Sequence, residues 1–300
     1  MIVVRVPAST ANLGPGFDAL GMALTLYAQV EVPSAGESAG TESAGSESAG
    51  TVSGEDVDRR GLVDDAHPAD VAFRAGGGVG PVRVRSPIPV GRGLGFSGAM
   101  RVGGLLAAAA QANAAAGHDV ADRLAVFDAA SQLEGHADNV GASLLGGVVA
   151  TAGGRAVPVP LAITPAVVVW VPDTRTSTQR SRNSLPATVT YQDAAFNVGR
   201  TALLVAALAT GDVDSLRTAT EDRLHQDVRF SATVPSRQAL AVGLDAGAWG
   251  GWLSGSGPSV ALLCDPAEAD LLAATVRDAV ADGHTKILQI AHTGATIELR

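Results

Sequence analysis

The segment GRGLGFSG at residues 91–98 has the glycine spacing of a loop that could hold a phosphate group. It follows an expected strand at 81–86 and precedes a run of small residues that is expected to form a helix. Glycine lets the backbone approach a ligand closely, and the free N–H groups and dipole at a helix start attract an anion. The Walker A pattern is absent, and a tight turn into a packed helix is the alternative interpretation.

The composition limits the other chemistry that is available. The chain has 300 residues with one lysine, Lys286, and one cysteine, Cys264, so any lysine beside a phosphate would have to be Lys286. A single cysteine excludes a disulfide framework and a cysteine-based zinc site, which favours a reducing cytoplasm. The net charge of −9 and the lack of a basic run argue against nucleic acid as a partner. No segment is typical of a membrane span.

The expected strands and helices mix without strict alternation, which is typical of an α+β or mixed α/β fold. The hydrophobic patterns predict strands at 2–6, 26–32, 81–86, 166–172, 260–264, 286–291 and 295–299, and helices at 98–116, 120–133, 194–210, 214–225, 236–246 and 267–282. Residues 34–50 repeat a SAG unit without large apolar side chains, so we expect a disordered spacer there. Glycines and prolines between 153 and 160 indicate a domain boundary near 150–165.

Two further glycine-rich loops adjoin expected strands, PASTANLGPGFDALG at 7–21 and GGWLSGSGPSVALL at 250–263. With the loop at 91–98 they resemble the three motifs of the GHMP small-molecule kinases. The combination of ANLGPGFD, HADN and EDRLHQ is more specific and resembles the homoserine kinases within that superfamily. The match covers most of the chain except about 33–75.

The resemblance implies an α+β fold of two domains with the active site between them. Residues 1–155 would form an N-terminal ATP-binding domain like domain 2 of ribosomal protein S5, with a low-complexity loop at 34–54. Residues 156–300 would form a ferredoxin-like C-terminal domain. The implied reaction transfers the γ-phosphoryl group of ATP to the side-chain hydroxyl of L-homoserine, giving O-phospho-L-homoserine for threonine biosynthesis. Homodimers are common in this family.

The same resemblance implies that the glycine loop cradles the phosphates of ATP. The matching residues are Pro89, Gly91, Arg92, Gly93, Leu94, Gly95, Phe96, Ser97 and Gly98. The family usually has GLGSSA where this chain has GLGFSG, so Phe96 replaces a serine and could crowd the nucleotide. Ser97 stays in register with the hydroxyl that approaches Mg²⁺ in the family, and a plain helix N-cap is its alternative role.

The family's metal carboxylate is a glutamate eight residues before the histidine of its HxDN motif. That position is Asp128 here, because His136 begins HADN. Aspartate is shorter by one methylene, so its contact with Mg²⁺ could run through water. Glu134 is a second candidate, and a solvated helix carboxylate is the alternative reading of Asp128.

An amino-acid substrate presents an ammonium, a carboxylate and a hydroxyl group. The substrate-binding residues that the resemblance implies are Asn12, Asp18, His136, Asn139, Thr178, Arg182 and Arg229. Asp18 suits the ammonium or the hydroxyl, and Arg182 and Arg229 suit the carboxylate through charge-assisted hydrogen bonds. Loop caps, structural polar groups and surface arginines are the alternative roles.

Asn12, Asp18 and Arg182 are the residues expected to act in the transfer itself. No lysine matches the base position of related kinases, so either Asp18 accepts the proton or the hydroxyl passes it to the phosphate. Two other functions stay open: a GHMP kinase for another hydroxyl substrate such as L-threonine or a cyclitol, and a non-catalytic ligand-binding descendant. A cyclitol has no carboxylate for the two arginines.

Overall fold

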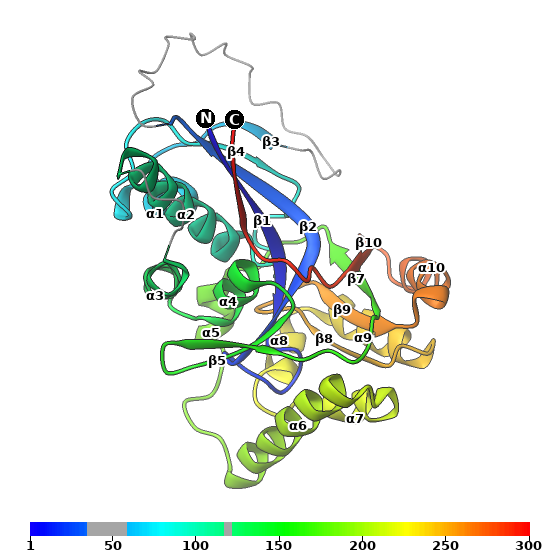
Figure 1. Ribbon diagram of the computed structural model, residues 1–300. Helices are drawn as coiled ribbons and strands as arrows, with labels where there is room; N and C mark the ends of the chain where they lie inside the picture. The colour runs from blue at the N-terminus through cyan, green and yellow to red at the C-terminus, as the bar shows by residue number, and fades with distance from the viewer. Residues whose placement is uncertain (35–58, 117–121) are drawn as a thin grey trace.

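The structure is a computed structural model that describes residues 1–34, 59–116 and 122–300. Apart from residue 34, the loop expected at 34–54 lies outside the described residues. Helices combine with two antiparallel sheets, which confirms the α+β prediction (Figure 1). None of the helices in the described ranges is both long and apolar enough to cross a membrane.

The first sheet is built mainly from the N-terminal half of the chain. Within the described ranges its strands are β1 (Ile2–Ala11), β2 (Leu20–Val32), β3 (Arg59–Leu62), β4 (Arg83–Ser86), β5 (Val148–Ala152), β6 (Arg155–Val159) and β11 (Thr296–Leu299). The order is β11-β1-β2-β4-β3, and β5 pairs with both β2 and β6. Its helices are α1 (Pro68–Ala75), α2 (Phe96–Ala116), α3 (Arg123–Glu134) and α4 (Asp138–Leu145). Helices α2 and α4 pack on β1 and β2, while α1 and α3 pack on α2.

The second sheet has the order β10 (Gly283–Gln289), β7 (Ala166–Pro172), β9 (Val260–Cys264) and β8 (Gly250–Leu253). If these four strands are numbered 1 to 4 along the chain, they lie in the sheet in the order 4-1-3-2. This is the ferredoxin-like arrangement expected for this part of the chain. The accompanying helices are α5 (Thr178–Asn183), α6 (Tyr191–Thr210), α7 (Leu216–Ala219), α8 (Gln226–Ala232), α9 (Val234–Asp245) and α10 (Ala269–Ala279), with short 3₁₀ turns at Val213–Ser215 and Pro266–Glu268.

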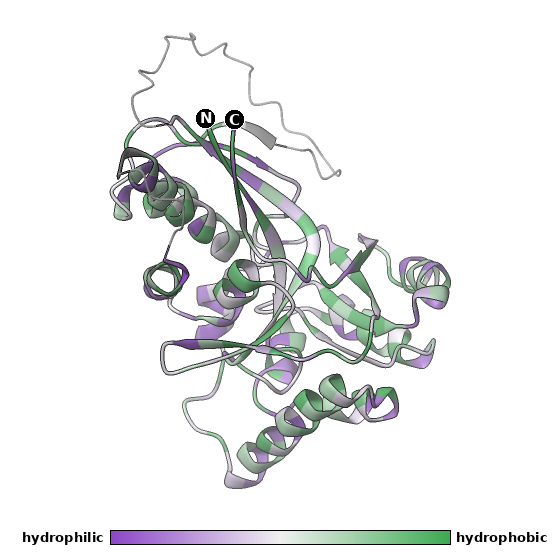
Figure 2. Cartoon of the chain, in the orientation of Figure 1, coloured by the Kyte–Doolittle hydropathy of each residue, from purple (hydrophilic) through white to green (hydrophobic). Residues whose placement is uncertain are grey.

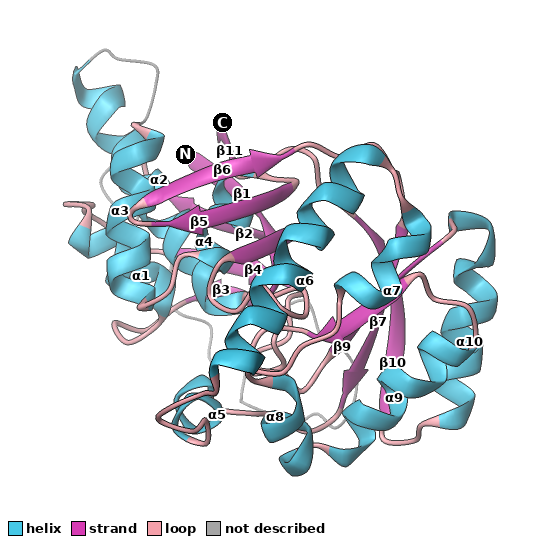
Figure 3. Cartoon of the chain, turned by 90° about the horizontal axis from the view of Figure 1, so that it is seen from below, coloured by secondary structure: helices cyan, strands magenta, loops and turns pink. Residues whose placement is uncertain are grey.

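Helices cover the second sheet and leave β7, β8 and β9 buried, while β10 at the edge is mostly half-buried. Helices α9 and α10 pack against its strands, as the view from below in Figure 3 shows. Strands β7, β8 and β9 are buried along their whole length and are coloured largely as hydrophobic residues in Figure 2. Continuous burial explains why β7 is a nearly unbroken run of valine and tryptophan.

The first sheet takes residues from both predicted domains. The predicted division between 155 and 156 falls at the start of β6, which pairs with β5, and β11 returns from the C-terminal end to pair with β1. The two chain ends therefore meet, and the Met1 amino group donates to the Arg300 carbonyl (Figure 1). The boundary between the domains stays a prediction.

The helix predicted at 214–225 is wrong in its second half. Helix α7 ends at Ala219, and α8 begins only at Gln226. The carboxylate of Asp222 accepts hydrogen bonds from the backbone N–H groups of Leu224, His225 and Gln226. These local bonds compete with helix hydrogen bonding, so the segment turns and then starts a new helix.

Two glycines in helix interiors give a matched test of the packing between α1 and α2. A Cβ atom at Gly104 of α2 would overlap the backbone carbonyl of Ala69 in α1, whereas a Cβ at Gly199 of α6 meets nothing within 4 Å. We expect Gly104→Ala to lower the free energy of unfolding by about 2 kcal/mol or more through overpacking. Gly199→Ala should raise it by about 0.5–1 kcal/mol through helix propensity.

Urea unfolding followed by circular dichroism measures both values. Equal effects of the two substitutions would contradict the close approach of α1 and α2.

Candidate functional site

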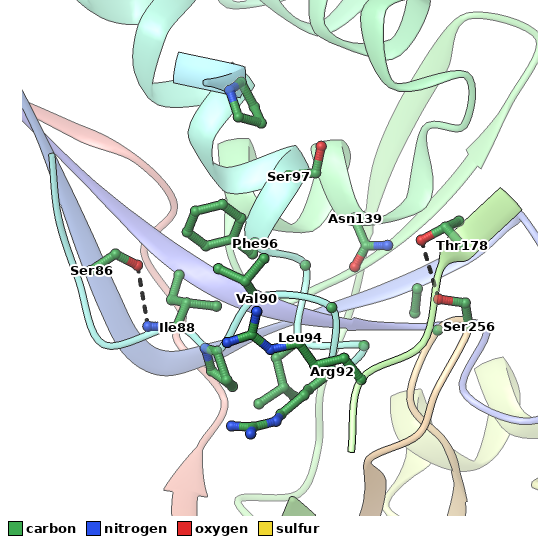
Figure 4. A pocket seen from close by; sticks show the side chains of 18 of the residues that line it. Ser86, Ile88, Val90, Arg92, Leu94, Phe96, Ser97, Asn139, Thr178 and Ser256 are labelled. Carbon is green, nitrogen blue, oxygen red and sulfur yellow. Dashed lines mark hydrogen bonds between the residues drawn. The ribbon is translucent and has the colours of Figure 1, made fainter. Parts of the chain in front are cut away.

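A cavity of about 1340 Å³ lies between the two sheets and is lined by residues from both. It contains all seven predicted substrate residues and every predicted phosphate residue except Gly98. Figure 4 shows the part around the glycine loop, with Phe96 and Ser97 at the start of α2 and Thr178 and Ser256 on the opposite wall. Gly98 is buried in the first turn of α2, where a Cβ atom would be 3.3 Å from the Cβ of Asn139.

The carbonyl groups of the glycine loop are held by the surrounding protein. Gly91, Gly93 and Gly95 adopt positive φ angles of 70°, 77° and 68°, a conformation that favours glycine. The carbonyl bonds run from Thr176 N to Gly91 O, from Ser259 N to Arg92 O, from Ser254 Oγ to Gly93 O and from Ser9 N to Leu94 O. The N–H groups in the first turn of α2 have no acceptor within the helix, so they are available to an anion.

Phe96 does not displace the loop that it interrupts. Its ring packs edge-on against His67, with centroids 5.7 Å apart and an interplanar angle of 85°. Figure 4 shows the Phe96 and Ser97 side chains leaving the start of α2 in different directions. The aromatic ring therefore forms part of the apolar wall, next to Val90, and leaves the Ser97 hydroxyl in the cavity.

The carboxylate next to Ser97 belongs to Glu134 and not to Asp128. Ser97 Oγ donates to Glu134 Oε2 over 2.8 Å, and Arg101 forms an ion pair with the same carboxylate. The Glu134 side chain is only 9% exposed. Asp128 is exposed on α3, near Gly154 in the turn between β5 and β6, and does not line the cavity.

Helix geometry explains this difference. Asp128 and Glu134 are six residues apart, or about one and two-thirds helical turns, so their side chains leave α3 in different directions. Burial lowers the pKa of Arg101 below its usual value. The Arg101 guanidinium still balances the charge of Glu134 at neutral pH.

Ser97 and Glu134 supply hard oxygen ligands of the kind that Mg²⁺ prefers. Within the described ranges, no group of three or more histidine, cysteine, aspartate or glutamate side chains could hold a metal. Mg²⁺ is usually bound by one or two carboxylates together with substrate phosphates and water. One hydroxyl and one carboxylate at the end of a phosphate loop therefore fit such an ion.

Asp18 and Arg182 form a bidentate ion pair across the cavity. Arg182 Nη1 and Nη2 donate to the two carboxylate oxygens of Asp18, each over 2.8 Å. This hydrogen bonding to Asp18 raises the pKa of Arg182. The two side chains are 36% and 37% exposed, so a ligand that enters the cavity could reach both.

Asn12 fixes the conformation of the first loop. Its Oδ1 accepts from the backbone N–H of Asp18, and its Nδ2 donates to the Gly255 carbonyl in the loop before β9. Asn12 and Asp18 both have positive φ angles, 70° and 57°, which asparagine and aspartate tolerate better than most residues. The loop at 12–18 is thus held in a strained shape that presents Asp18 to the cavity.

Arg229 reaches the same carbonyl from α8. Its Nη1 donates to Gly255 O over 3.0 Å and lies 3.1 Å from Nδ1 of His225. Burial, together with the nearby charge of Arg182, lowers the pKa of Arg229 to about 10. Arg229 is therefore still charged at neutral pH and supplies a buried cation to the cavity.

The remaining predicted residues line the middle of the cavity. Asn139 Oδ1 accepts from Ser9 Oγ over 2.8 Å, which leaves its amide nitrogen available. His136 Nδ1 lies 3.3 Å from Asp138 Oδ1, and its Nε2 lies 3.7 Å from Glu134 Oε1. Thr178 Oγ1 and Ser256 Oγ are 3.3 Å apart and form a pair of hydroxyls from α5 and the loop before β9.

The sequence analysis missed four residues of this site. Asp138 is a buried carboxylate that lines the cavity, and Asn197, Asp222 and His225 form a buried network behind Arg229. Two of them stand in the EDRLHQ motif, and His225 lies four residues before Arg229, where one helical turn brings side chains together. That spacing could have identified His225 as a neighbour of Arg229. Asn197 gave none, because it comes from the distant helix α6.

Known proteins match the chain in sequence and in fold. The family model described as GHMP kinases N terminal domain matches residues 66–147, and GHMP kinases C terminal matches residues 204–282. The homoserine kinase of Moorella thermoacetica is 40% identical over 272 residues, which cover 88% of each chain. The homoserine kinase of Streptomyces avermitilis is 42% identical over 287 residues, which cover 90% of this chain and 88% of the relative.

Solved structures share the fold over nearly the whole length. The homoserine kinase from Cytophaga hutchinsonii has a TM-score of 0.78 at 22% identity and covers 99% of this chain and 97% of its own. The L. major mevalonate kinase in complex with R-mevalonate has a TM-score of 0.67 at 13% identity, with 97% and 96% covered. At these identities the solved structures show the fold alone, and together with the two family models they confirm the expected GHMP kinase fold. With the sequence matches over 88% and 90% of its length, the chain belongs to the homoserine kinase family of the GHMP kinases.

Proposed function

We propose that the protein transfers the γ-phosphoryl group of ATP to the side-chain hydroxyl of L-homoserine, with Mg²⁺ bound beside the phosphates. One observation carries the proposal. A single cavity joins an anion-binding helix start at one end to a zwitterion-binding cluster of Asp18, Asp138, Arg182 and Arg229 at the other. The relatives in the homoserine kinase family support the choice of substrate. The cytoplasmic location and a homodimer remain predictions.

The two ends of the cavity suit the two substrates in charge. The first-turn N–H groups of α2 and the loop at 91–98 would hold the phosphates. Arg182 and Arg229 would bind the carboxylate of the amino acid through charge-assisted hydrogen bonds. The carboxylates of Asp18 and Asp138 would attract the ammonium and orient the hydroxyl. A cyclitol lacks both charged groups and would leave two arginines without an anion.

Positioning accounts for most of the chemistry that these residues can supply. Phosphoryl transfer depends mainly on alignment and on neutralising charge at the phosphoryl oxygens. Ser97 and Glu134 would hold Mg²⁺, which when bound neutralises phosphate charge. Both oxygens of Asp18 already accept from Arg182, so we assign Asp18 to orienting the hydroxyl rather than to removing its proton. The proton then passes to the transferred phosphoryl group.

The direct test is ADP release from Mg-ATP in the presence of L-homoserine, beside L-threonine, L-serine and no acceptor. We expect a clear preference for L-homoserine in kcat/KM. The pair of arginines recognises only the carboxylate, so discrimination has to come from the hydroxyl position near Asp18. A preference for L-threonine would change the substrate and keep the fold. Binding of ATP or L-homoserine by calorimetry without turnover would favour a non-catalytic ligand-binding protein.

Glu134→Gln and Asp128→Asn separate the two candidate metal carboxylates. Each substitution removes one charge from α3 and keeps the side-chain size. We expect Glu134→Gln to lower kcat by about 100-fold or more, since it removes the charged oxygen beside Ser97. It should also raise the Mg²⁺ concentration needed for half-maximal rate. Asp128→Asn should change kcat by less than about twofold, because an exposed side chain outside the cavity has little influence. The opposite ranking would return the metal to Asp128.

Gly93→Ala and Gly91→Ala test the packing of the phosphate loop. Both glycines have similar positive φ angles, so both substitutions carry the same backbone strain. A Cβ atom at Gly93 would overlap the Ser254 carbonyl, while one at Gly91 would be 3.4 Å from its nearest neighbour. We expect Gly93→Ala to raise the KM for ATP by about tenfold more than Gly91→Ala, because a displaced loop misplaces its N–H groups. Steady-state kinetics with varied ATP measures the difference, and equal KM values would contradict this role of Ser254.

A further inference from the structure

The hydrogen bonds of Arg229 divide its guanidinium into an occupied side and an unoccupied side. Nη1 is held between the Gly255 carbonyl at 3.0 Å and His225 Nδ1 at 3.1 Å. Nε is buried and has no hydrogen-bond partner among the described residues. Because Arg229 lines the cavity and Nη2 is not among its buried atoms, the N–H groups of Nη2 are the donors left for a ligand. Hydrogen bonds between a guanidinium and a carboxylate are charge-assisted and therefore strong.

His225 determines which side of Arg229 is occupied. Its Nε2 lies 2.8 Å from the Gly14 carbonyl, which can only accept, so Nε2 carries the proton. Nδ1 of the neutral ring then has a lone pair and accepts from Arg229 Nη1. The side chain is fully buried, and the Phe17 ring lies beside it with centroids 5.2 Å apart. His225 thus links the first loop to Arg229 through its two ring nitrogens.

A second layer of polar contacts holds His225 in place. The fully buried Asp222 carboxylate accepts from the His225 backbone N–H at 3.0 Å and from Asn197 Nδ2 at 2.7 Å. Asn197 Nδ2 also donates to the Pro15 carbonyl in the first loop. These bonds fix the backbone of His225 and of the first loop, while the bonds to Gly14 and Arg229 hold the ring itself.

We propose that His225 is a positioning residue whose neutral ring holds Arg229 Nη1, so that Nη2 faces the carboxylate of the amino-acid substrate. The inference rests on the proposed function, because it needs that carboxylate as the ligand. It assigns to His225 no contact with the substrate and no proton transfer.

The proposal has a pH dependence with a definite sign. The groups that face His225 are Asp222 and Arg229 on its own segment and Asp18 from the first loop. Burial lowers the pKa of His225 below 6.5, with Asp222 acting in the opposite direction and Arg229 reinforcing the decrease. The ring is therefore neutral at pH 7. Protonation at lower pH turns Nδ1 into a donor that opposes the Arg229 donor, so the KM for the amino acid should rise as the pH falls through this lowered pKa.

Two isosteric substitutions separate the two ring nitrogens. The amide of His225→Asn can place an acceptor near the Nδ1 position but does not reach Gly14. The amide of His225→Gln can place a donor near the Nε2 position and keeps the Gly14 bond. We expect His225→Gln to raise the KM for L-homoserine by about tenfold or more, since a hydrogen bond to a charged group is lost. The KM of His225→Asn should lie closer to that of the wild type, and neither variant should show the rise at low pH.

The controls distinguish positioning from a general loss of structure. Thermal unfolding checks that each variant is folded, and the KM for ATP should change far less than the KM for L-homoserine. In an Arg229→Lys background there is no guanidinium for His225 to orient. His225→Gln should therefore cause no further change in the KM for L-homoserine. Equal KM effects of the Asn and Gln variants, or parallel loss for both substrates, would overturn the proposal. If the wild type neither binds nor phosphorylates L-homoserine, the proposed function fails first.

Discussion

The site depends on one shared acceptor, the backbone carbonyl of Gly255. Asn12 from the first loop and Arg229 from α8 both donate to it, and the Gly255 N–H donates in turn to Ala11. A carbonyl oxygen has two lone pairs, so these two donors satisfy it. Because the first loop, α8 and the loop before β9 are far apart in the sequence, the cavity has its observed shape only when all three are in place. Glycine is favoured here, since its φ of 55° lies in the left-handed region.

Charge balance explains how so many ionised groups can line one cavity. Arg182 is paired with Asp18, Arg101 with Glu134, and Arg229 is stabilised by the carbonyl and by a neutral histidine. A buried charge without partners is costly, and pairing with hydrogen bonding offsets that cost. Arg229 differs from the other two arginines. Burial lowers its pKa to about 10, and its Nε has no partner in the described structure. An anionic group from a ligand would accept from Nη2 of Arg229 in a charge-assisted hydrogen bond.

The sequence predicted the parts of the site that local chemistry determines. The glycine loop, Asn12, Asp18, Arg182 and Arg229 could be named because each stands in a motif that resembles the GHMP kinases or the homoserine kinases. The choice between Asp128 and Glu134 could not be made, because it depends on where α3 ends and which way its last turn faces. Asn197 and the pairing of β11 with β1 could not be foreseen either, since both join residues that are far apart in the sequence.

The substitution at Phe96 illustrates why the phosphate loop tolerates a change in its middle. In the proposed function the loop would offer backbone N–H groups to a ligand, while its carbonyls accept hydrogen bonds from Ser9, Thr176, Ser254 and Ser259. A side chain at the first position of α2 does not alter these bonds, provided that it finds its own contacts. Phe96 finds them against His67. The property that matters for such a loop is therefore its backbone shape, which depends on the glycines at 91, 93 and 95 more than on the residue that follows them.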